Sequence, residues 1–293
     1  MKIVTNMVTD TENAYELIRS GKAGFYEQKR GLISVRGKEA RKFLDGLITN
    51  DVKTLDGGTS MLAAFPNAQG RLLAVVRVRG FDDIFFIETE EATREKVFQN
   101  LFRFTFAGDF FVTDISENFR YFEIFNSDTP MRATGMTFIS PASSGRFEEA
   151  WQAEGGAFGI EIDDNTYETI RIESGIPKYG VDMDETTIVP ELGLDGLISY
   201  NKGCYIGQEI IARIHFRGHV AKRLAGLISD HELTAGAELS IDGKNAGRVT
   251  SVTFSPKLNK HIALGYVRYD HLAPGTSLTA NDHEVTVAEL PLI

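Results

Sequence analysis

The chain has 293 residues, 42% of them hydrophobic and 25% charged, a balance typical of a globular protein with a sizeable core. Its 41 acidic and 31 basic residues give a formal net charge of −10, which argues against broad, nonspecific binding to nucleic acid. No apolar run approaches the roughly 20 residues of a membrane-spanning helix, and the N-terminus has neither a secretion signal nor a transit pattern. We therefore expect a cytoplasmic protein of about two domains, or three small ones, and we expect it to be monomeric.

The first part of the chain predicts short strands and two amphipathic helices. Residues 25–35 have the pattern of a strand and turn, and residues 38–48 that of a helix with its apolar residues on one face. Strand-like runs at 61–65, 71–78 and 84–88 are separated by turn residues, which indicates hairpins. Helical spacing over 90–103 and a strand pattern over 110–115 follow.

The middle of the chain is less regular. Residues 121–125 predict a strand, and residues 128–145 are rich in Pro, Ser, Thr and Gly, which favours a loop. Helices are predicted over 147–152 and 163–173. The recurring alternation of strands and helices predicts an α+β body with antiparallel sheets.

From residue 220 onward the pattern changes to short alternating strands. They are predicted over 223–229, 238–241, 247–254, 262–269, 277–279 and 284–290. Turns such as Asp242-Gly243 and Pro274-Gly275 separate them, and regular spacing of this kind predicts a small β-barrel. We place a domain boundary near residue 220.

One octapeptide, Lys-Gly-Cys-Tyr-Ile-Gly-Gln-Glu at residues 202–209, contains the only cysteine of the chain. A single thiol forms no intrachain disulfide, and glycines at 203 and 207 let the backbone turn and approach a ligand. A cation at Lys202 favours the reactive thiolate of Cys204. The alternative is a small buried hydrophobic residue, because free cysteine is often buried. We interpret the octapeptide as a functional site.

The octapeptide resembles the signature of the YgfZ-type, folate-binding branch of the glycine-cleavage T-protein superfamily, whose mitochondrial relatives serve iron–sulfur cluster assembly. Three further stretches fit the same superfamily in the same order, namely residues 31–37 running into 43–52, then Gly70-Arg71, then 171–180. Together the matching pieces span most of the chain.

The resemblance implies a fold and a division into domains. The expected fold is an α+β, three-domain cloverleaf around a central hole, with two α+β domains and a C-terminal β-barrel. The first domain would comprise residues 1–118 with 170–219, the inserted second domain 119–169, and the barrel 220–293.

The resemblance also implies a tetrahydrofolate site. Glu173 occupies the position of a carboxylate that binds the pterin ring, and a carboxylate can accept two hydrogen bonds from an amino-pyrimidine edge. The alternative is a helix-end charge in water. Arg171, Arg213 and Arg217 are candidates for the glutamate tail, because guanidinium groups bind carboxylates bidentately. Tyr179 is a candidate for packing against the pterin, although such aromatic residues are more often part of the core.

Further candidates for the cofactor site follow from the same motifs. Asn50 and Asp51 end a motif shared across the superfamily, but Asn-Asp is also what a turn requires. Within the octapeptide, the residues expected to contact the cofactor are Gly203, Tyr205, Gln208 and Glu209.

One departure from the superfamily pattern bears on activity. Aminomethyl-transferring T-proteins carry a catalytic aspartate where this chain has Ala74 and Val75, and no Asp or Glu lies between Gly70 and Phe81. Neither side chain can exchange a proton, so aminomethyl transfer by that mechanism is disfavoured.

Cys204 is then the leading candidate for reactivity, as a redox thiol, a transient cluster ligand or a covalent partner of a substrate. A stable cluster held by one chain needs about four thiolate or imidazole ligands, so any cluster would be shared or in transit. His215 and His219 are four residues apart, but we interpret residues 213–219 as a strand and turn and predict no metal site.

The leading hypothesis is a tetrahydrofolate-binding accessory protein that supports assembly or repair of iron–sulfur clusters in client enzymes, acting on client or assembly proteins. The alternative is a folate-dependent aminomethyltransferase or other one-carbon transferase. A third hypothesis is a binding module that uses folate only for structure.

Overall fold

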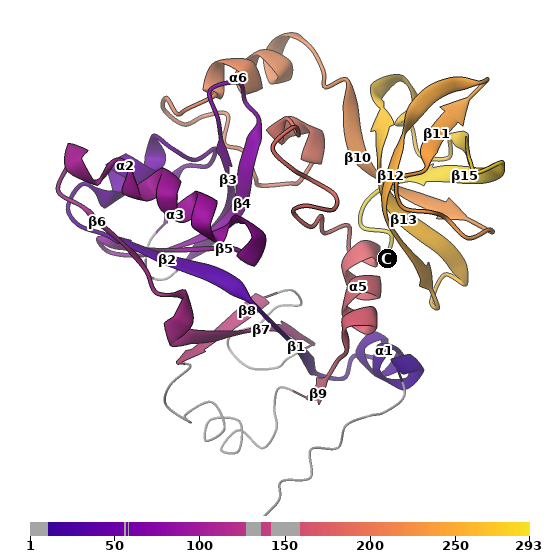
Figure 1. The fold of residues 1–293 in the computed structure, drawn as a ribbon, viewed down its shortest axis with the longest axis horizontal. Helices are drawn as coiled ribbons and strands as arrows, with labels where there is room; N and C mark the ends of the chain where they lie inside the picture. Colours follow the sequence, from indigo (N-terminus) through magenta and orange to yellow (C-terminus); the bar gives the residue numbers. More distant parts are fainter. Residues whose placement is uncertain (1–10, 56, 58, 127–135, 142–158) are drawn as a thin grey trace, which may run out of the picture. The chain divides into compact units, whose positions relative to one another are not determined.

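The computed structural model describes residues 11–55, 57, 59–126, 136–141 and 159–293 (Figure 1). The chain divides into two compact units. The first comprises Met1–Arg30 and Ile115–Ile170, and the second comprises Gly31–Asp114 and Arg171–Ile293.

The first unit is built on a four-stranded sheet in the order β8-β7-β1-β9. Its elements are α1 (Thr11–Arg19), β1 (Gly24–Gln28), β7 (Phe119–Phe125), β8 (Met136–Pro141) and β9 (Ile160–Glu161). Strand β7 runs antiparallel to β1 and β8, and β9 is parallel to β1. Apolar residues of α1, β7 and the segment after β9 form its core, among them Tyr15, Ile18, Phe125 and Ile162.

Strand β8 corrects the prediction of a loop over residues 128–145. Thr137, Phe138 and Ile139 are good strand formers, and β7 supplies the edge with which they pair. Turn-forming residues around them in sequence hid this short run. The rest of that stretch and the helix predicted over 147–152 lie outside the described residues.

The second unit contains a five-stranded sheet in the order β3-β4-β5-β2-β6. Its strands are β2 (Arg30–Arg36), β3 (Ser60–Pro66), β4 (Leu72–Phe81), β5 (Ile84–Glu90) and β6 (Phe111–Asp114). Every second residue of β4 is buried, from Leu72 to Gly80, as the alternating pattern predicts. Helices α2 (Ala40–Asp45) and α3 (Arg94–Phe102) pack with this face through residues such as Leu44 and Leu101.

The same unit ends in a closed six-stranded barrel in the order β10-β13-β12-β11-β14-β15 (Figure 1). The strands are β10 (Lys222–Ser229), β11 (Glu238–Ile241), β12 (Lys244–Ser255), β13 (Lys260–Arg268), β14 (Ser277–Ala280) and β15 (His283–Ala288). The inward side chains are small or branched apolar residues, for example Leu227, Val249 and Val285. The α+β class and the C-terminal barrel are therefore confirmed, whereas the expected domain boundaries stay a prediction.

Candidate functional site

The octapeptide 202–209 leads from a loop into helix α6 (Gln208–Arg217). Lys202 and Tyr205 are buried, whereas Gly203 and Cys204 are exposed. The Gln208 side-chain amide donates to the Gly203 carbonyl at 3.4 Å. The thiol is thus presented to solvent between two buried residues that fix the ends of its loop.

The Lys202 ammonium is the anchor of this loop. Its Nζ donates to the backbone oxygens of Asp45, Ile48 and Asn50 at 2.6, 2.8 and 2.9 Å, and it lies 3.2 Å from the Asp45 carboxylate. Burial lowers the pKa of Lys202, although Asp45 opposes the shift. Three carbonyls use all three donors of the ammonium, so Lys202 supports the backbone rather than acting as a counter-ion of Cys204.

Asn50 and Asp51 have structural partners in the same region. The Asn50 amide Nδ2 donates to the backbone oxygens of Leu62 and Gly196 at 2.8 and 2.6 Å, which ties strand β3 to the loop before the octapeptide. The Asp51 carboxylate caps the short helix η1 (Val52–Thr54). The turn interpretation of this pair is confirmed, and a role in cofactor binding stays a prediction.

The two glycines of the octapeptide differ in what they require. Gly207 has a φ of +81°, and a Cβ there would lie 2.4 Å from the Asn67 carbonyl oxygen, so only glycine fits this approach to the β3–β4 turn. Figure 1 shows α6 beside that turn. Gly203 has open space around it, since a Cβ added there would meet no described atom within 4 Å.

Glu173 ends helix α5 (Asp164–Glu173) and has no exposed surface. Its Oε1 accepts a hydrogen bond from Ser255 Oγ at 2.5 Å, and its backbone oxygen accepts from the Leu292 amide at 2.7 Å. The alternative of a helix-end charge in water is therefore wrong, and the pterin-binding role of Glu173 stays a prediction. In this structure one oxygen of the Glu173 carboxylate is already bonded to Ser255 of the barrel, so a pterin ring would share the carboxylate with that hydroxyl.

Arg171 lies in a buried ion pair. Its Nη1 donates to Asp182 Oδ2 at 2.8 Å and to the Ile176 carbonyl at 2.6 Å, and its Nη2 donates to Ser251 Oγ at 2.8 Å. Both charged side chains are at most 2% exposed. The guanidinium is committed to these partners, which argues against the prediction that Arg171 receives the glutamate tail of a folate.

Tyr179 is partly buried and packs with the loop that precedes the octapeptide. Its hydroxyl accepts from Lys96 Nζ at 2.9 Å, the same ammonium lies 5.1 Å from its ring centroid, and its amide donates to the Glu90 carboxylate at 3.0 Å. These contacts fix both the ring and the backbone of this residue within the fold.

The strand predicted over residues 213–219 is wrong, because α6 is helical through Arg217. Ile210, Ile211 and Ile214 have helical spacing and turn their apolar side chains to one face, with Ile211 fully buried. The alternating Arg and His residues concealed this spacing. Helical geometry separates His215 from His219, since the helix ends between them at Gly218.

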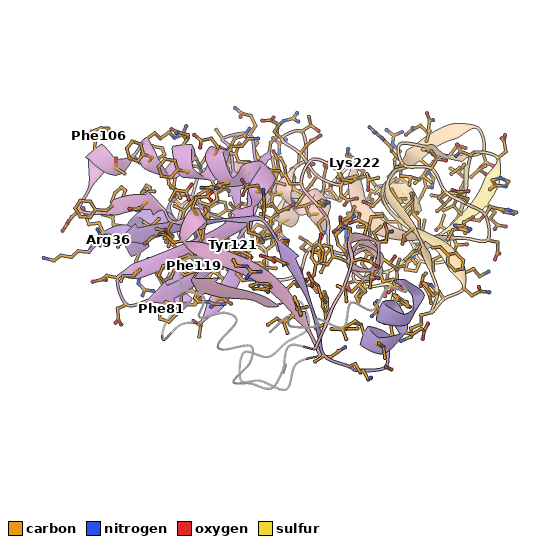
Figure 2. All side chains as sticks on the ribbon, turned by 60° about the horizontal axis from the view of Figure 1, so that its bottom comes forward. Arg36, Phe81, Phe106, Phe119, Tyr121 and Lys222 are labelled. Atoms are coloured by element: carbon orange, nitrogen blue, oxygen red, sulfur yellow. The ribbon has the colours of Figure 1, made fainter. Side chains whose placement is uncertain are left out.

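The outer side of α6 is polar and exposed. Glu209, Arg213 and Arg217 lie four residues apart along the helix and are all exposed. The basic stretch continues past the helix to Lys222 at the start of β10, labelled in Figure 2, whose ammonium lies 4.7 Å from the Tyr266 ring centroid.

Ala74 and Val75 lie within apolar surroundings. Ala74 is fully buried in the core beneath the five-stranded sheet, and Val75 packs on the opposite side with the loop that carries Tyr179. Neither position offers an acid or a base. The described residues contain no group of three or more His, Cys, Asp or Glu side chains arranged to hold a metal ion.

Sequence reasoning missed the partners that hold these residues. Asp45, Asp182 and Ser255 carry no motif, and each is brought to its partner by the tertiary fold. No local pattern marks them, because each lies far from its partner along the chain or in a segment without periodicity.

None of the helices in the described part of the chain has the length and apolar character of a membrane-spanning segment.

Comparison with known proteins identifies the barrel. Residues 222–293 match the family described as the glycine cleavage T-protein C-terminal barrel domain. The crystal structure of glycine cleavage system aminomethyltransferase T from Bartonella henselae superposes with a TM-score of 0.84, covering 96% of this chain and 89% of that one. At 18% identity this similarity establishes the fold alone.

Two curated relatives differ in what they are named for. The iron-sulfur cluster assembly factor IBA57 homolog, mitochondrial, of Mycosarcoma maydis is 28% identical over 68% of this chain and 55% of its own length. An aminomethyltransferase of Rubrobacter xylanophilus is 26% identical over 95% of this chain and 82% of its own. The chain thus spans about half the length of the first of these relatives.

Proposed function

We propose that the chain is a member of the glycine-cleavage T-protein superfamily and, within it, a YgfZ-type, tetrahydrofolate-binding accessory protein for the assembly or repair of iron–sulfur clusters. The match of its barrel to the T-protein C-terminal barrel domain and the shared fold support this proposal. The observation that carries the proposal is the exposed Cys204 on a loop fixed by the buried Lys202. Similarity to a relative named as an iron–sulfur cluster assembly factor supports it. A cytoplasmic location is part of the proposal, although that relative is named as mitochondrial.

Cys204 supplies one thiolate to a cluster, and the client or assembly protein supplies the others. The chain has one cysteine, and a cluster needs about four ligands, so the cluster is shared during transfer. The anchored loop keeps the thiol at the surface, where a second protein can reach it.

The test of this role is complementation in a strain that lacks the protein. We expect Cys204→Ser to lose most of the activity of cluster-containing client enzymes, because serine is a poor cluster ligand. Asn201→Ser, an exposed change in the same loop, is the matched control and should complement fully. Full complementation by Cys204→Ser would remove the thiol from the mechanism.

The folate part of the proposal rests on superfamily membership and on Glu173. The carboxylate suits an amino-pyrimidine edge chemically, but its Oε1 is bonded to Ser255 in this structure. Calorimetric titration with tetrahydrofolate tests whether Glu173 binds the pterin ring. We expect Glu173→Gln to weaken binding about tenfold or more, and Ser255→Ala to leave or strengthen it. Unchanged affinity in Glu173→Gln would place the pterin elsewhere, and no binding to the wild type would remove folate.

The second candidate function is a folate-dependent one-carbon or aminomethyl transferase. Similarity over 95% of the chain to a protein named aminomethyltransferase favours it. The apolar Ala74 and Val75 oppose it, because neither supplies the acid or base that proton transfer needs. Folate-dependent turnover of a methylamine-bearing donor by the purified protein would establish this function instead.

A further inference from the structure

The C-terminal half of α6 presents a group of aromatic and basic side chains to solvent. We call the α6 face the set Tyr200, Arg213, His215, Phe216 and Arg217. Phe216 is 67% exposed, and the His215 ring stacks on Tyr200 with centroids 3.6 Å apart. Phe216 meets both rings edge-on, at 6.1 Å from Tyr200 and 4.7 Å from His215. The three rings form one preassembled aromatic cluster.

The two arginines of the α6 face are unused within the fold. Neither guanidinium makes a hydrogen bond or ion pair with any other described residue, in contrast to Arg171 and Arg120. Residues 208–223 contain four Arg or Lys and a single acid, Glu209, in a chain of net charge −10. Positive charge is therefore concentrated in this segment, and the charges of Arg213 and Arg217 make no contact within the described fold.

We propose that the α6 face is the docking surface for an acidic partner protein. Exposed arginine beside tyrosine and phenylalanine is the composition that protein interfaces favour at their centre. The ring contacts hold Tyr200, His215 and Phe216 in place before binding, which lowers the entropy cost of association. Complementary charge requires carboxylates on the partner. The rest of this acidic chain repels such carboxylates, so they are directed to the α6 face.

A small folate tail is the competing occupant of Arg213 and Arg217. A glutamate tail needs guanidinium groups but leaves the outward Phe216 and its neighbouring rings uncovered. Burial of the exposed phenylalanine against a protein accounts for both the charge and the aromatic cluster. The observations therefore favour a protein.

The position of the face deepens the proposed function, on which this step rests. Helix α6 begins four residues after Cys204, and at 1.5 Å per residue its far end lies about 14 Å from its start. An interface of ordinary size spans both, so a partner docked on the α6 face brings its own ligands to the thiol.

The test places a photo-crosslinking amino acid, p-benzoylphenylalanine, at position 216 of the full chain in its host cells. Position 254, a phenylalanine 45% exposed on the barrel, is the control site. We expect an adduct with an acidic protein at 216 and not at 254. The adduct should disappear in Arg213→Glu/Arg217→Glu and persist in Arg213→Lys/Arg217→Lys.

The captured protein, once identified and purified, is then titrated with the chain. We expect Arg213→Glu/Arg217→Glu to lower the affinity about tenfold or more, with a salt-dependent wild-type affinity. Lys244→Glu/Lys257→Glu, the same charge change on exposed barrel residues, should leave it within about twofold. The absence of an adduct specific to 216, or an adduct that survives charge reversal, overturns the proposal.

Tetrahydrofolate distinguishes the competing occupant. If Arg213→Glu/Arg217→Glu abolishes tetrahydrofolate binding in calorimetry while the adduct at 216 remains, the arginines serve the folate tail and the docking proposal is wrong. The crosslinking result does not depend on cluster assembly. Full complementation by Cys204→Ser therefore bears on the proposed function and leaves the docking surface to its own test.

Discussion

At the scale of single residues, Lys202 shows how a motif residue acquires a role that its neighbours in sequence do not reveal. Its ammonium is fully buried and bound to three carbonyls and one carboxylate from residues 45–50. A buried charge of this kind is tolerated only because every donor is satisfied, and removing it leaves the acceptors unpaired. The lysine thus links the thiol loop to the end of α2.

Lys202→Met should lower the free energy of unfolding by about 3 kcal/mol, because it leaves buried acceptors without a donor. Urea denaturation followed by circular dichroism measures the change. Lys53→Met is the matched control, since Lys53 pairs with the same Asp45 carboxylate at 3.1 Å while its side chain is 60% exposed. We expect a much smaller loss there, and equal losses in the two variants would contradict the anchoring role.

The pH dependence of stability gives a second test of this pair. Burial by itself raises the pKa of Asp45, but Lys53 and Lys202 outweigh it and hold that pKa below its ordinary value. A lowered folded-state pKa stabilises the protein above the unfolded value, and this contribution is lost as the pH falls through the folded value. The stability gap between wild type and Asp45→Asn should therefore narrow from about pH 5 towards pH 2. A constant gap over that range would contradict a lowered pKa of Asp45 in the folded protein. Asp270→Asn, a substitution of an exposed aspartate, serves as the control.

At the scale of elements, the junction between the octapeptide and α6 is set by backbone geometry. Gly207 adopts a left-handed conformation directly before the helix and lies against the β3–β4 turn, where a Cβ added at Gly70 would lie 3.2 Å from the Ile210 side chain. The helix then buries Ile211 and leaves Arg213, His215, Phe216 and Arg217 exposed, with His215 stacked on Tyr200 of the preceding loop. A turn, a helix start and an exposed thiol are thereby fixed together.

Gly207→Ala should destabilise the fold by about 2 kcal/mol or more, since alanine there combines strained backbone with a clash at 2.4 Å. Gly203→Ala, four residues earlier in the same motif, should change stability by less than about 0.5 kcal/mol because its surroundings are open. Thermal unfolding of both variants measures this contrast. Similar losses would show that the two glycines are equivalent. A stable Gly203→Ala protein that fails to bind tetrahydrofolate would support close approach of a ligand at Gly203.

At the scale of the whole molecule, the second unit joins its sheet-bearing part to the barrel through buried polar contacts. Arg171 and Glu173 both lie at the end of α5 and bind the β12 residues Ser251 and Ser255. Asp182 completes the network by pairing with Arg171 and accepting from Ser251 at 2.6 Å. Residues 171–173 therefore fasten the barrel to the rest of its unit.

Arg171→Met should lower the free energy of unfolding by about 3 to 5 kcal/mol, because it leaves the buried Asp182 carboxylate without its positive partner. Combining it with Asp182→Asn should restore part of the loss, which a double-mutant cycle by urea denaturation would report as a coupling of about 1 kcal/mol or more. Arg248 is an exposed arginine of β12, the strand that carries Ser251. Arg248→Met is therefore the control and should leave the free energy of unfolding nearly unchanged. Strict additivity of the Arg171 and Asp182 changes would mean that the pair does not act as a unit.

The sequence by itself determined the local features of this protein. Alternating burial along β4 followed from a period-two hydrophobic pattern, regularly spaced short strands predicted the barrel, and the octapeptide marked the exposed thiol. The prediction of a strand and turn over residues 213–219 was wrong, because the alternating basic residues there concealed the helical spacing of Ile210, Ile211 and Ile214. Only the tertiary structure decided that Lys202, Arg171 and Glu173 are buried, since burial of a charge depends on partners distant in sequence. Local patterns are encoded by neighbours along the chain, whereas the satisfaction of a buried charge is encoded by the packing of segments that meet only in the fold.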